Sequence, residues 1–226
     1  MAPTFYIFRH VEGAHELSGE GRICGDPDLS DAGRQRCAKL HNKLLWMDKV
    51  SQLVSSPIQR ALGSCLLIFE PVISRGKRTI ALPELTDAGT REASFGSSKS
   101  VLADNLDDKV DLGSPPVSWD NPDPEGEFGC SPEERLEHRQ TVVRVLLWGH
   151  EAALLSDVHV VMMNRRLLVQ FLAEEFDAPA FGAVVTWGSS GVLPIPVRPP
   201  SRKDDVRFFE TRESHLRESL LTQPRR

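Results

Sequence analysis

The chain has 226 residues, of which 40% are hydrophobic and 26% are charged, and its formal net charge at pH 7 is -5. This length suits one sizeable α/β domain, and the composition is that of a globular protein. The charge argues against a general binder of nucleic acid or of anionic membranes, because both partners require a basic surface. The N-terminus has no signal-peptide pattern and no apolar run is long enough to cross a membrane, so we expect a cytoplasmic protein.

The first half of the chain alternates apolar runs with amphipathic segments. Ser30 is the expected N-cap of a helix whose apolar stripe includes Cys37 and Leu40. Pro57 and Pro83 each close a short apolar run, as is typical where a strand ends. The predicted elements are a strand at Thr4–Phe8, a helix within 29–48, a strand within 51–57, a helix within 58–73 and a strand at Thr79–Leu82.

Residues 86–130 are dense in Gly, Pro, Ser and Asp and show no sustained periodicity, which predicts a loop or lid excursion. A capping box at Ser131 with Glu134 then predicts a helix as far as Leu155. The later predicted elements are a strand at 158–163, a helix at 164–176 and two closing strands at 183–187 and 191–197. We therefore expect one domain over residues 1–198, followed by a charged, peripheral tail at 199–226.

The four cysteines, Cys24, Cys37, Cys65 and Cys130, are widely spaced and form no CxxC pair. This spacing favours reduced thiols over a zinc site or a disulfide framework. Cys37 and Cys65 lie on predicted apolar helical stripes, where a thiol behaves as a small hydrophobic group.

Strands alternating with helices predict an α/β fold with a doubly wound, mainly parallel sheet. In such sheets ligands bind at the carboxyl ends of the strands. Four predicted strands deliver polar groups to that edge: Arg9 and His10, Ser55 and Ser56, the segment Pro83 to Asp87, and Asn164 to Arg166. The sequence therefore predicts a pocket there.

The predicted pocket combines cations, an imidazole and carboxylates. Arg9, Arg60 and Arg165 would hold an anion, because guanidinium groups bind phosphate and carboxylate in a bidentate way. A neutral His10 could attack an electrophile or transfer a proton. The candidate general acids and bases are Glu12, Glu16, Glu84 and Asp87.

Three of these segments together resemble the histidine phosphatase superfamily, the phosphoglycerate mutase-like proteins, and most of all its fungal-type branch. They are "FRHVEGAHE", "DPDLSDAGRQRCAKL" and "VSSPIQRALGSCLLIF", and the likeness continues through "LPELTD" and "GSSKSVL" to about residue 102. The resemblance implies a phosphoaccepting His10, phosphate clamps at Arg9 and Arg60 and an acid at Asp87. It also implies phosphoryl transfer without a metal or other cofactor. Ser97, in "GSSKSVL", is a further candidate for substrate binding.

Several positions depart from the superfamily pattern. The second pocket histidine is missing, since "VVMMNRR" places Asn164 or Arg165 at its position. Glu16 stands where an asparagine usually contacts phosphate, and a carboxylate about 4 Å from a phosphate oxygen opposes binding by several kcal/mol at an effective dielectric constant near 20. Val11 replaces the glycine after Arg-His. These changes predict poor hydrolysis of ordinary phosphomonoesters, with His10 still required for activity.

Three functions remain open on the sequence. The first is a repurposed enzyme that uses His10, Glu12 and Asp87 for acid–base chemistry on a small anionic or enolisable metabolite, by dehydration, isomerisation, cyclisation or hydrolysis. The fungal resemblance favours secondary metabolism for it. The second is a phosphomonoester hydrolase that acts through His10, and the third is a pseudoenzyme that binds an anion or a partner protein. We expect a monomer or homodimer with no nucleic-acid or membrane partner.

Overall fold

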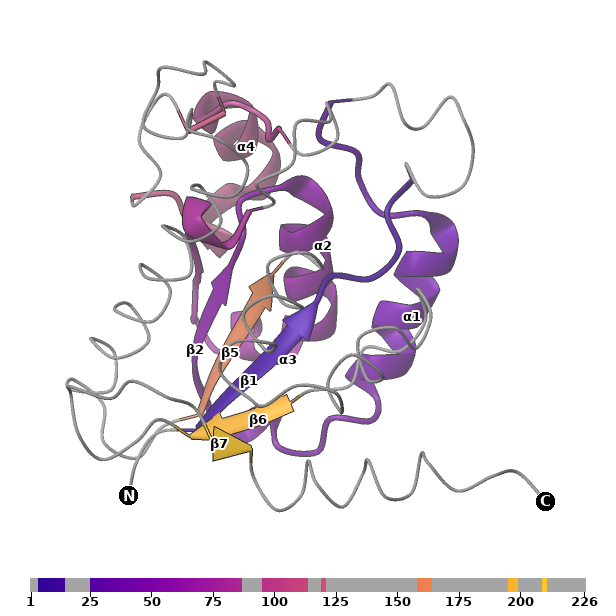
Figure 1. Cartoon of the computed structure of the whole chain (residues 1–226), viewed down its shortest axis with the longest axis vertical. Helices are drawn as coiled ribbons and strands as arrows, with labels where there is room; N and C mark the ends of the chain where they lie inside the picture. The colour runs from indigo at the N-terminus through magenta and orange to yellow at the C-terminus, as the bar shows by residue number, and fades with distance from the viewer. Residues whose placement is uncertain are drawn as a thin grey trace.

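The computed structural model of the chain describes the parts of the sequence that are coloured in Figure 1. These are residues 4–14, 25–86, 95–113, 119–120, 158–163, 195–198 and 209–210. The predicted helices at 131–155 and 164–176 and the predicted strand at 183–187 lie outside the described residues, so they remain predictions.

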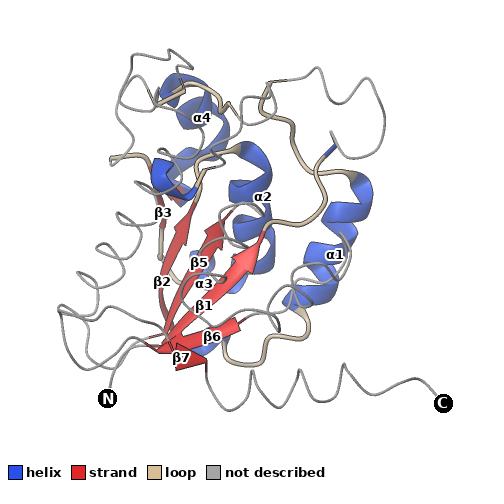
Figure 2. Cartoon of the chain, viewed as in Figure 1, coloured by secondary structure: helices blue, strands red, loops and turns tan. Residues whose placement is uncertain are grey.

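The described strands form one sheet, in which five neighbouring strands are parallel. Their order is β4-β3-β2-β5-β1-β6-β7, with β6 antiparallel to β1 and β7 antiparallel to β6. The strands are β1 Thr4–Arg9, β2 Val50–Ser55, β3 Thr79–Ala81, β4 Val110–Asp111, β5 Val158–Met163, β6 Ile195–Arg198 and β7 Phe209–Glu210. With helices along it (Figure 2), this sheet confirms the predicted α/β fold class.

The described helices occur mostly where the sequence pattern predicts them. They are α1 Asp31–His41, α2 Gln59–Ile68, α3 Glu70–Ser74 and α4 Lys99–Leu106, with short 3-10 turns at Met47–Lys49, Pro83–Leu85 and Asp107–Lys109. Ser30 caps α1 as predicted, because its Oγ accepts a hydrogen bond of 2.9 Å from the backbone N–H of Gly33. None of these helices has the length and apolar character needed to span a bilayer.

The helix predicted at 58–73 is instead two helices, α2 and α3, that meet at Phe69. Pro71 explains the break, since it lacks the N–H that a continuous helix would need and its ring would clash with the preceding turn. The same proline is tolerated in the first turn of α3.

The core lies between α2 and the centre of the sheet. Phe8 of β1 and Phe69 are both fully buried and meet edge to face, with ring centroids 5.4 Å apart. Burying a side chain of this size contributes about 1.5–3 kcal/mol to stability. Cys37 and Cys65 are buried as predicted, and desolvation raises the pKa of their thiols to about 11 and about 12. Both are therefore protonated and unreactive at neutral pH.

Part of the segment 86–130 is regular, in contrast to the predicted excursion. Residues 99–106 form α4, whose N-cap Ser98 accepts a hydrogen bond from the backbone N–H of Val101. β4 then adds a fifth parallel strand beside β3. Sequence periodicity missed both elements because α4 buries only Leu102 and β4 has two residues.

The C-terminal tail also contributes to the sheet. Phe209 and Glu210 form β7 and pair with Arg198 and Val197 of β6. The sequence predicts a peripheral tail because this segment is charged. It does not predict β7, because two residues carry too little periodic pattern to be recognised as a strand.

Candidate active site

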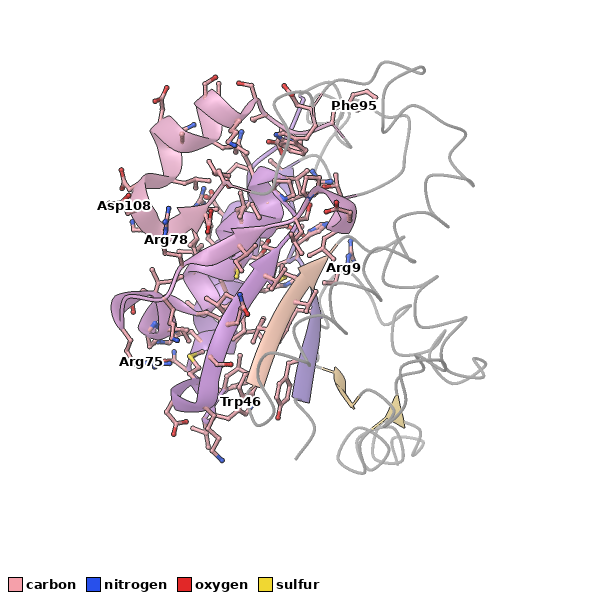
Figure 3. All side chains as sticks on the ribbon, turned by 90° about the vertical axis from the view of Figure 1, so that its left-hand side faces the viewer. Arg9, Trp46, Arg75, Arg78, Phe95 and Asp108 are labelled. Carbon is pink, nitrogen blue, oxygen red and sulfur yellow. The ribbon has the colours of Figure 1, made fainter. Side chains whose placement is uncertain are left out.

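The candidate site lies where the parallel strands end. Arg9 is paired with Met163, so β1 and β5 end together, and His10 follows directly. Ser56 follows β2, and its backbone N–H donates to the carbonyl of Met162 over 3.0 Å. Figure 3 shows Arg9 at this end of the sheet. The predicted meeting of strand ends at one edge is therefore present in the structure.

His10 is held in one defined protonation state. Its Nδ1 lies 2.7 Å from the carbonyl oxygen of Val11, and its Nε2 lies 3.4 Å from Nε of Arg60. A carbonyl can only accept a hydrogen bond and a guanidinium N–H can only donate one, so Nδ1 carries the proton and Nε2 presents its lone pair. The ring is 3% exposed. The contacts therefore select a neutral imidazole with Nε2 directed at a cation.

Arg60 reaches His10 from the first turn of α2 and is only 2% exposed. It is the largest fully buried side chain among the described residues. Because a guanidinium is always charged and is costly to bury, it is typical of sites that receive an anion. The structure thus brings together His10 and Arg60, two of the residues selected from the sequence.

Ser64 connects the backbone next to His10 with α2. The N–H of Val11 donates to Ser64 Oγ at 3.1 Å, and that hydroxyl donates to the carbonyl of Arg60 at 2.7 Å. Ser64 is fully buried. It was not predicted from the sequence, since a serine four residues after Arg60 on an apolar helix gives only a weak signal.

Glu12 turns its carboxylate towards α1. Its Oε1 accepts a hydrogen bond of 2.7 Å from Ser30 Oγ, and its Oε2 lies 3.8 Å from NH1 of Arg36. Its two oxygens therefore contact the N-cap and the middle of α1, and they hold this helix against the loop after β1. The catalytic role predicted for Glu12 remains a prediction.

Ser97 lies close to the start of α2. Its Oγ accepts a hydrogen bond of 2.9 Å from Gln59 Nε2, and its backbone N–H donates to Asp26 Oδ2 at 2.7 Å. Beside it, the ring of Trp119 covers Gly96 so closely that a Cβ at 96 would approach Trp119 Cη2 to 1.7 Å. Asp26 was not singled out from the sequence, although it lies in a segment that carries the family resemblance.

Four further predicted site residues cannot be placed. Asp87, Glu16, Asn164 and Arg165 lie outside the described residues. The residue before Asp87 is Thr86, whose Oγ1 forms a hydrogen bond of 2.9 Å with Ser56 Oγ. This contact ties the chain entering Asp87 to the end of β2.

Gly33 allows α1 to approach the loop that follows His10. A Cβ at this position would lie 2.3 Å from the carbonyl oxygen of Glu12. Alanine is intrinsically better than glycine in a helix by about 1 kcal/mol, yet we expect Gly33→Ala to lower the free energy of unfolding by about 1–3 kcal/mol because the backbone must move. Urea unfolding would measure the change.

Gly63→Ala in α2 is the matched control for this substitution. Its added Cβ would meet side-chain atoms alone, those of Leu29 from 3.3 Å and Asp28 Oδ1 at 3.6 Å. We expect its stability to stay within about 1 kcal/mol of the wild type. A Gly33→Ala protein at least as stable as the wild type would show that the contact with Glu12 is not close.

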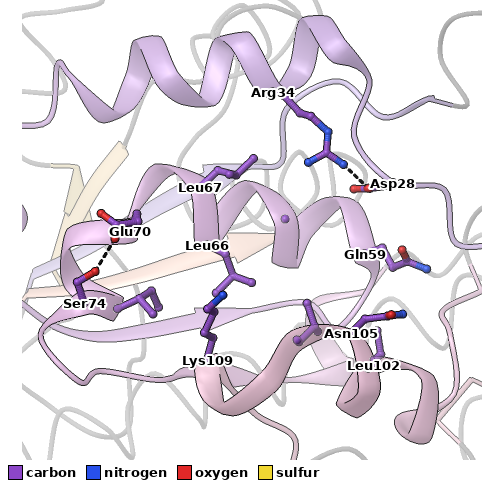
Figure 4. A pocket seen from close by; sticks show the side chains of 13 residues that line it. Asp28, Arg34, Gln59, Leu66, Leu67, Glu70, Ser74, Leu102, Asn105 and Lys109 are labelled. Carbon is purple, nitrogen blue, oxygen red and sulfur yellow. Dashed lines mark hydrogen bonds and ion pairs between the residues drawn. The ribbon is translucent and has the colours of Figure 1, made fainter.

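A separate groove of about 600 Å³ runs between α2 and α4 (Figure 4). Its floor is apolar, with Leu66 and Leu102, and an ion pair between Arg34 and Asp28 lies at one end. Neither His10 nor Arg60 lines it. This groove is therefore distinct from the candidate site at the sheet edge.

Comparisons with known proteins identify a family model that matches this chain and solved structures that are similar to it. The family model described as the histidine phosphatase superfamily (branch 1) matches residues 5–162. A mycobacterial glucosyl-3-phosphoglycerate phosphatase is 16% identical, with a TM-score of 0.53 and coverage of 92% of this chain and 96% of that chain. A phosphoglycerate mutase from Bacillus anthracis is 14% identical, with a TM-score of 0.56 and coverage of 93% and 92%.

The ecdysone phosphate phosphatase of Bombix mori, solved with tungstate, is 9% identical and has a TM-score of 0.58, with 92% of each chain covered. At these identities the solved structures show a shared fold. A search among curated proteins gave no match.

Proposed function

Because the chain belongs to the histidine phosphatase superfamily, we propose that it hydrolyses a phosphomonoester through a phosphohistidine at His10. One observation carries the proposal: Nδ1–H of His10 is fixed by Val11, and the Nε2 lone pair faces Arg60 at 3.4 Å. A neutral imidazole in this orientation is a nucleophile, and the adjacent cation attracts a phosphate dianion. The resemblance to the superfamily is thus confirmed, while the fungal-type branch remains a prediction.

In the first step, Nε2 of His10 attacks phosphorus and the bond from phosphorus to the leaving oxygen breaks. The leaving alkoxide takes a proton from an acid, the role that the resemblance gives to Asp87. Arg60, with Arg9 as the second predicted clamp, stabilises the charge on the phosphoryl oxygens. The ring becomes cationic while Nδ1 keeps its proton, and the Val11 carbonyl at 2.7 Å stabilises that charge.

In the second step, water attacks phosphorus, the N–P bond breaks and inorganic phosphate leaves. The bonding electrons return to Nε2, which restores the neutral ring, and the proton released by water goes to the carboxylate that acted as the acid. The same arginine contacts would stabilise both transition states.

Trapping the phosphohistidine tests this proposal. After brief incubation with radiolabelled p-nitrophenyl phosphate and an alkaline quench, the label should map to the peptide that contains His10 and should be lost in acid. His41→Ala is the matched control, because Nδ1 of His41 also contacts a backbone carbonyl, that of Ile68 at 3.2 Å. Phosphate release without any labelled peptide, or an unlabelled and inactive wild type, would contradict the proposal.

Acid–base chemistry on an anionic or enolisable metabolite is the second candidate function. The observation that favours it lies in the sequence, where Asn164 or Arg165 stands at the position that the resemblance gives to the second pocket histidine. Under this alternative, turnover of the metabolite would depend on His10, but no phosphohistidine would form. Anion binding without any turnover would instead indicate a pseudoenzyme.

A further inference from the structure

Asp26 is a buried carboxylate that the proposed reaction does not use. It is 4% exposed, and its backbone φ of 48° lies in the left-handed region that residues other than glycine rarely adopt. Burial raises its pKa above 3.8, although hydrogen bonds from Ser97 and Gln59 and the charge of Arg60 oppose that shift. A residue that is strained in its backbone and desolvated in its side chain persists where the surrounding contacts require it.

The Asp26 carboxylate joins two segments that are distant in sequence. Its Oδ1 accepts a hydrogen bond of 2.8 Å from the backbone N–H of Gln59, and its Oδ2 accepts one of 2.7 Å from the backbone N–H of Ser97. A third hydrogen bond, from Gln59 Nε2 to Ser97 Oγ, completes a closed set of contacts among the three residues. The start of α2 and the loop leading into α4 are thereby held by one side chain.

These contacts supply a cap that α2 does not provide for itself. Its N-cap residue, Ile58, makes no side-chain capping bond. The amide groups of a first helical turn need acceptors, and a negative charge beside them is favourable. Gln59 is the first residue of α2 and Arg60 is the second, so the carboxylate fixes the turn from which Arg60 reaches Nε2 of His10.

We infer that Asp26 is a positioning residue for phosphoryl transfer, which holds Arg60 against His10 by bonding Gln59 and Ser97. The inference rests on the proposed function and extends it to a residue outside the reacting groups. A displacement of about 1 Å in a positioned group can lower the rate about 10²-fold. Loss of the carboxylate should therefore reduce catalysis and oxyanion binding beyond what any loss of stability explains.

Two substitutions separate positioning from stability. Asp26→Gly and Asp26→Ala both remove the carboxylate, but only glycine adopts a φ near 48° without strain. Asp26→Gly should melt at the higher temperature of the two, yet both should lower kcat for p-nitrophenyl phosphate about 10²-fold. Both should also raise the dissociation constant of orthovanadate, measured by calorimetry, about tenfold or more. Activity that recovers together with stability in Asp26→Gly would overturn the inference.

The exposed neighbour Asp28 provides the matched control. Its side chain is 48% exposed and pairs with Arg34, so Asp28→Asn should leave kcat and orthovanadate binding unchanged. In an Arg60→Met background, Asp26→Gly should add little further loss, because residues that act through one another are not additive. Full additivity would overturn the inference.

The binding and turnover measurements also distinguish this inference from the proposed function. A wild type that binds orthovanadate more tightly than Asp26→Gly does, but releases no phosphate, would overturn the proposed function and support positioning by Asp26. Equal orthovanadate affinity in the wild type and Asp26→Gly would overturn the inference alone.

Discussion

Replacing His10 by alanine should lower kcat/KM for p-nitrophenyl phosphate by about 10⁴-fold or more, because the proposed reaction then has no nucleophile. The protein should remain folded. Removal of the ring takes a hydrogen-bond partner from the Val11 carbonyl and from Nε of Arg60, at a cost of about 1–3 kcal/mol for each group. Steady-state kinetics with a circular dichroism spectrum of each variant would measure both effects.

The size of the loss distinguishes the two chemical roles of His10. General acid–base assistance alone is worth about 10²–10⁴ in rate. A metabolite whose turnover falls within that range in His10→Ala, without any phosphohistidine in the wild type, would favour the acid–base alternative. Unchanged phosphate release in His10→Ala would exclude His10 from the reaction, and His41→Ala should behave like the wild type throughout.

Arg60→Met should give a protein that is folded but nearly inactive. In the proposed reaction the guanidinium donates to the phosphoryl oxygens, and loss of such a donor typically lowers kcat about 10²–10³-fold. Stability should fall as well, since Nε2 of His10 loses its donor and the buried Asp26 carboxylate loses a nearby positive charge. Thermal unfolding and phosphatase kinetics on the same preparation would separate the loss of activity from the loss of stability.

Two further variants sharpen the Arg60 experiment. Arg60→Lys keeps the charge but loses the planar fork and the Nε–H that contacts His10, so activity should stay well below the wild type. Arg34→Met removes an exposed arginine and should leave kinetics unchanged. Full activity in Arg60→Lys would mean that only the charge matters, and full activity in Arg60→Met would remove Arg60 from the site.

Much of the fold could be predicted because its signals are local. Apolar runs closed by proline or by polar residues marked β1, β2, β3 and β5, and the Ser30 cap marked α1. The meeting of His10 with Arg60 followed from the rule that parallel strands deliver their ends to one edge, together with motifs in the family's order. Elements of two residues, such as β4 and β7, have no periodicity to detect.

The supporting residues of the site could not be predicted in the same way. Asp26 and Ser64 act through hydrogen bonds to backbone groups of distant segments, at Gln59, Ser97 and Val11. A single sequence does not show which distant backbone groups such a side chain will meet, or on which side of the chain it will point. The split between α2 and α3 was accessible in principle, since Pro71 is visible in the sequence, but its effect depends on where the preceding helix begins.

The position of β1 in the sheet affects how the chain folds during synthesis. Thr4 pairs with Val158, and the other described neighbour of β1 is β6, still later in the chain. Pairings this distant form slowly, because loop closure must precede any gain in contact energy. β5 also lies between β1 and β2. On the ribosome, β1, which leads to His10, and β2, which leads to the helix that carries Arg60, therefore have no common partner until residues 158–163 emerge. Until then their apolar surface stays exposed, and chaperones bind such surface.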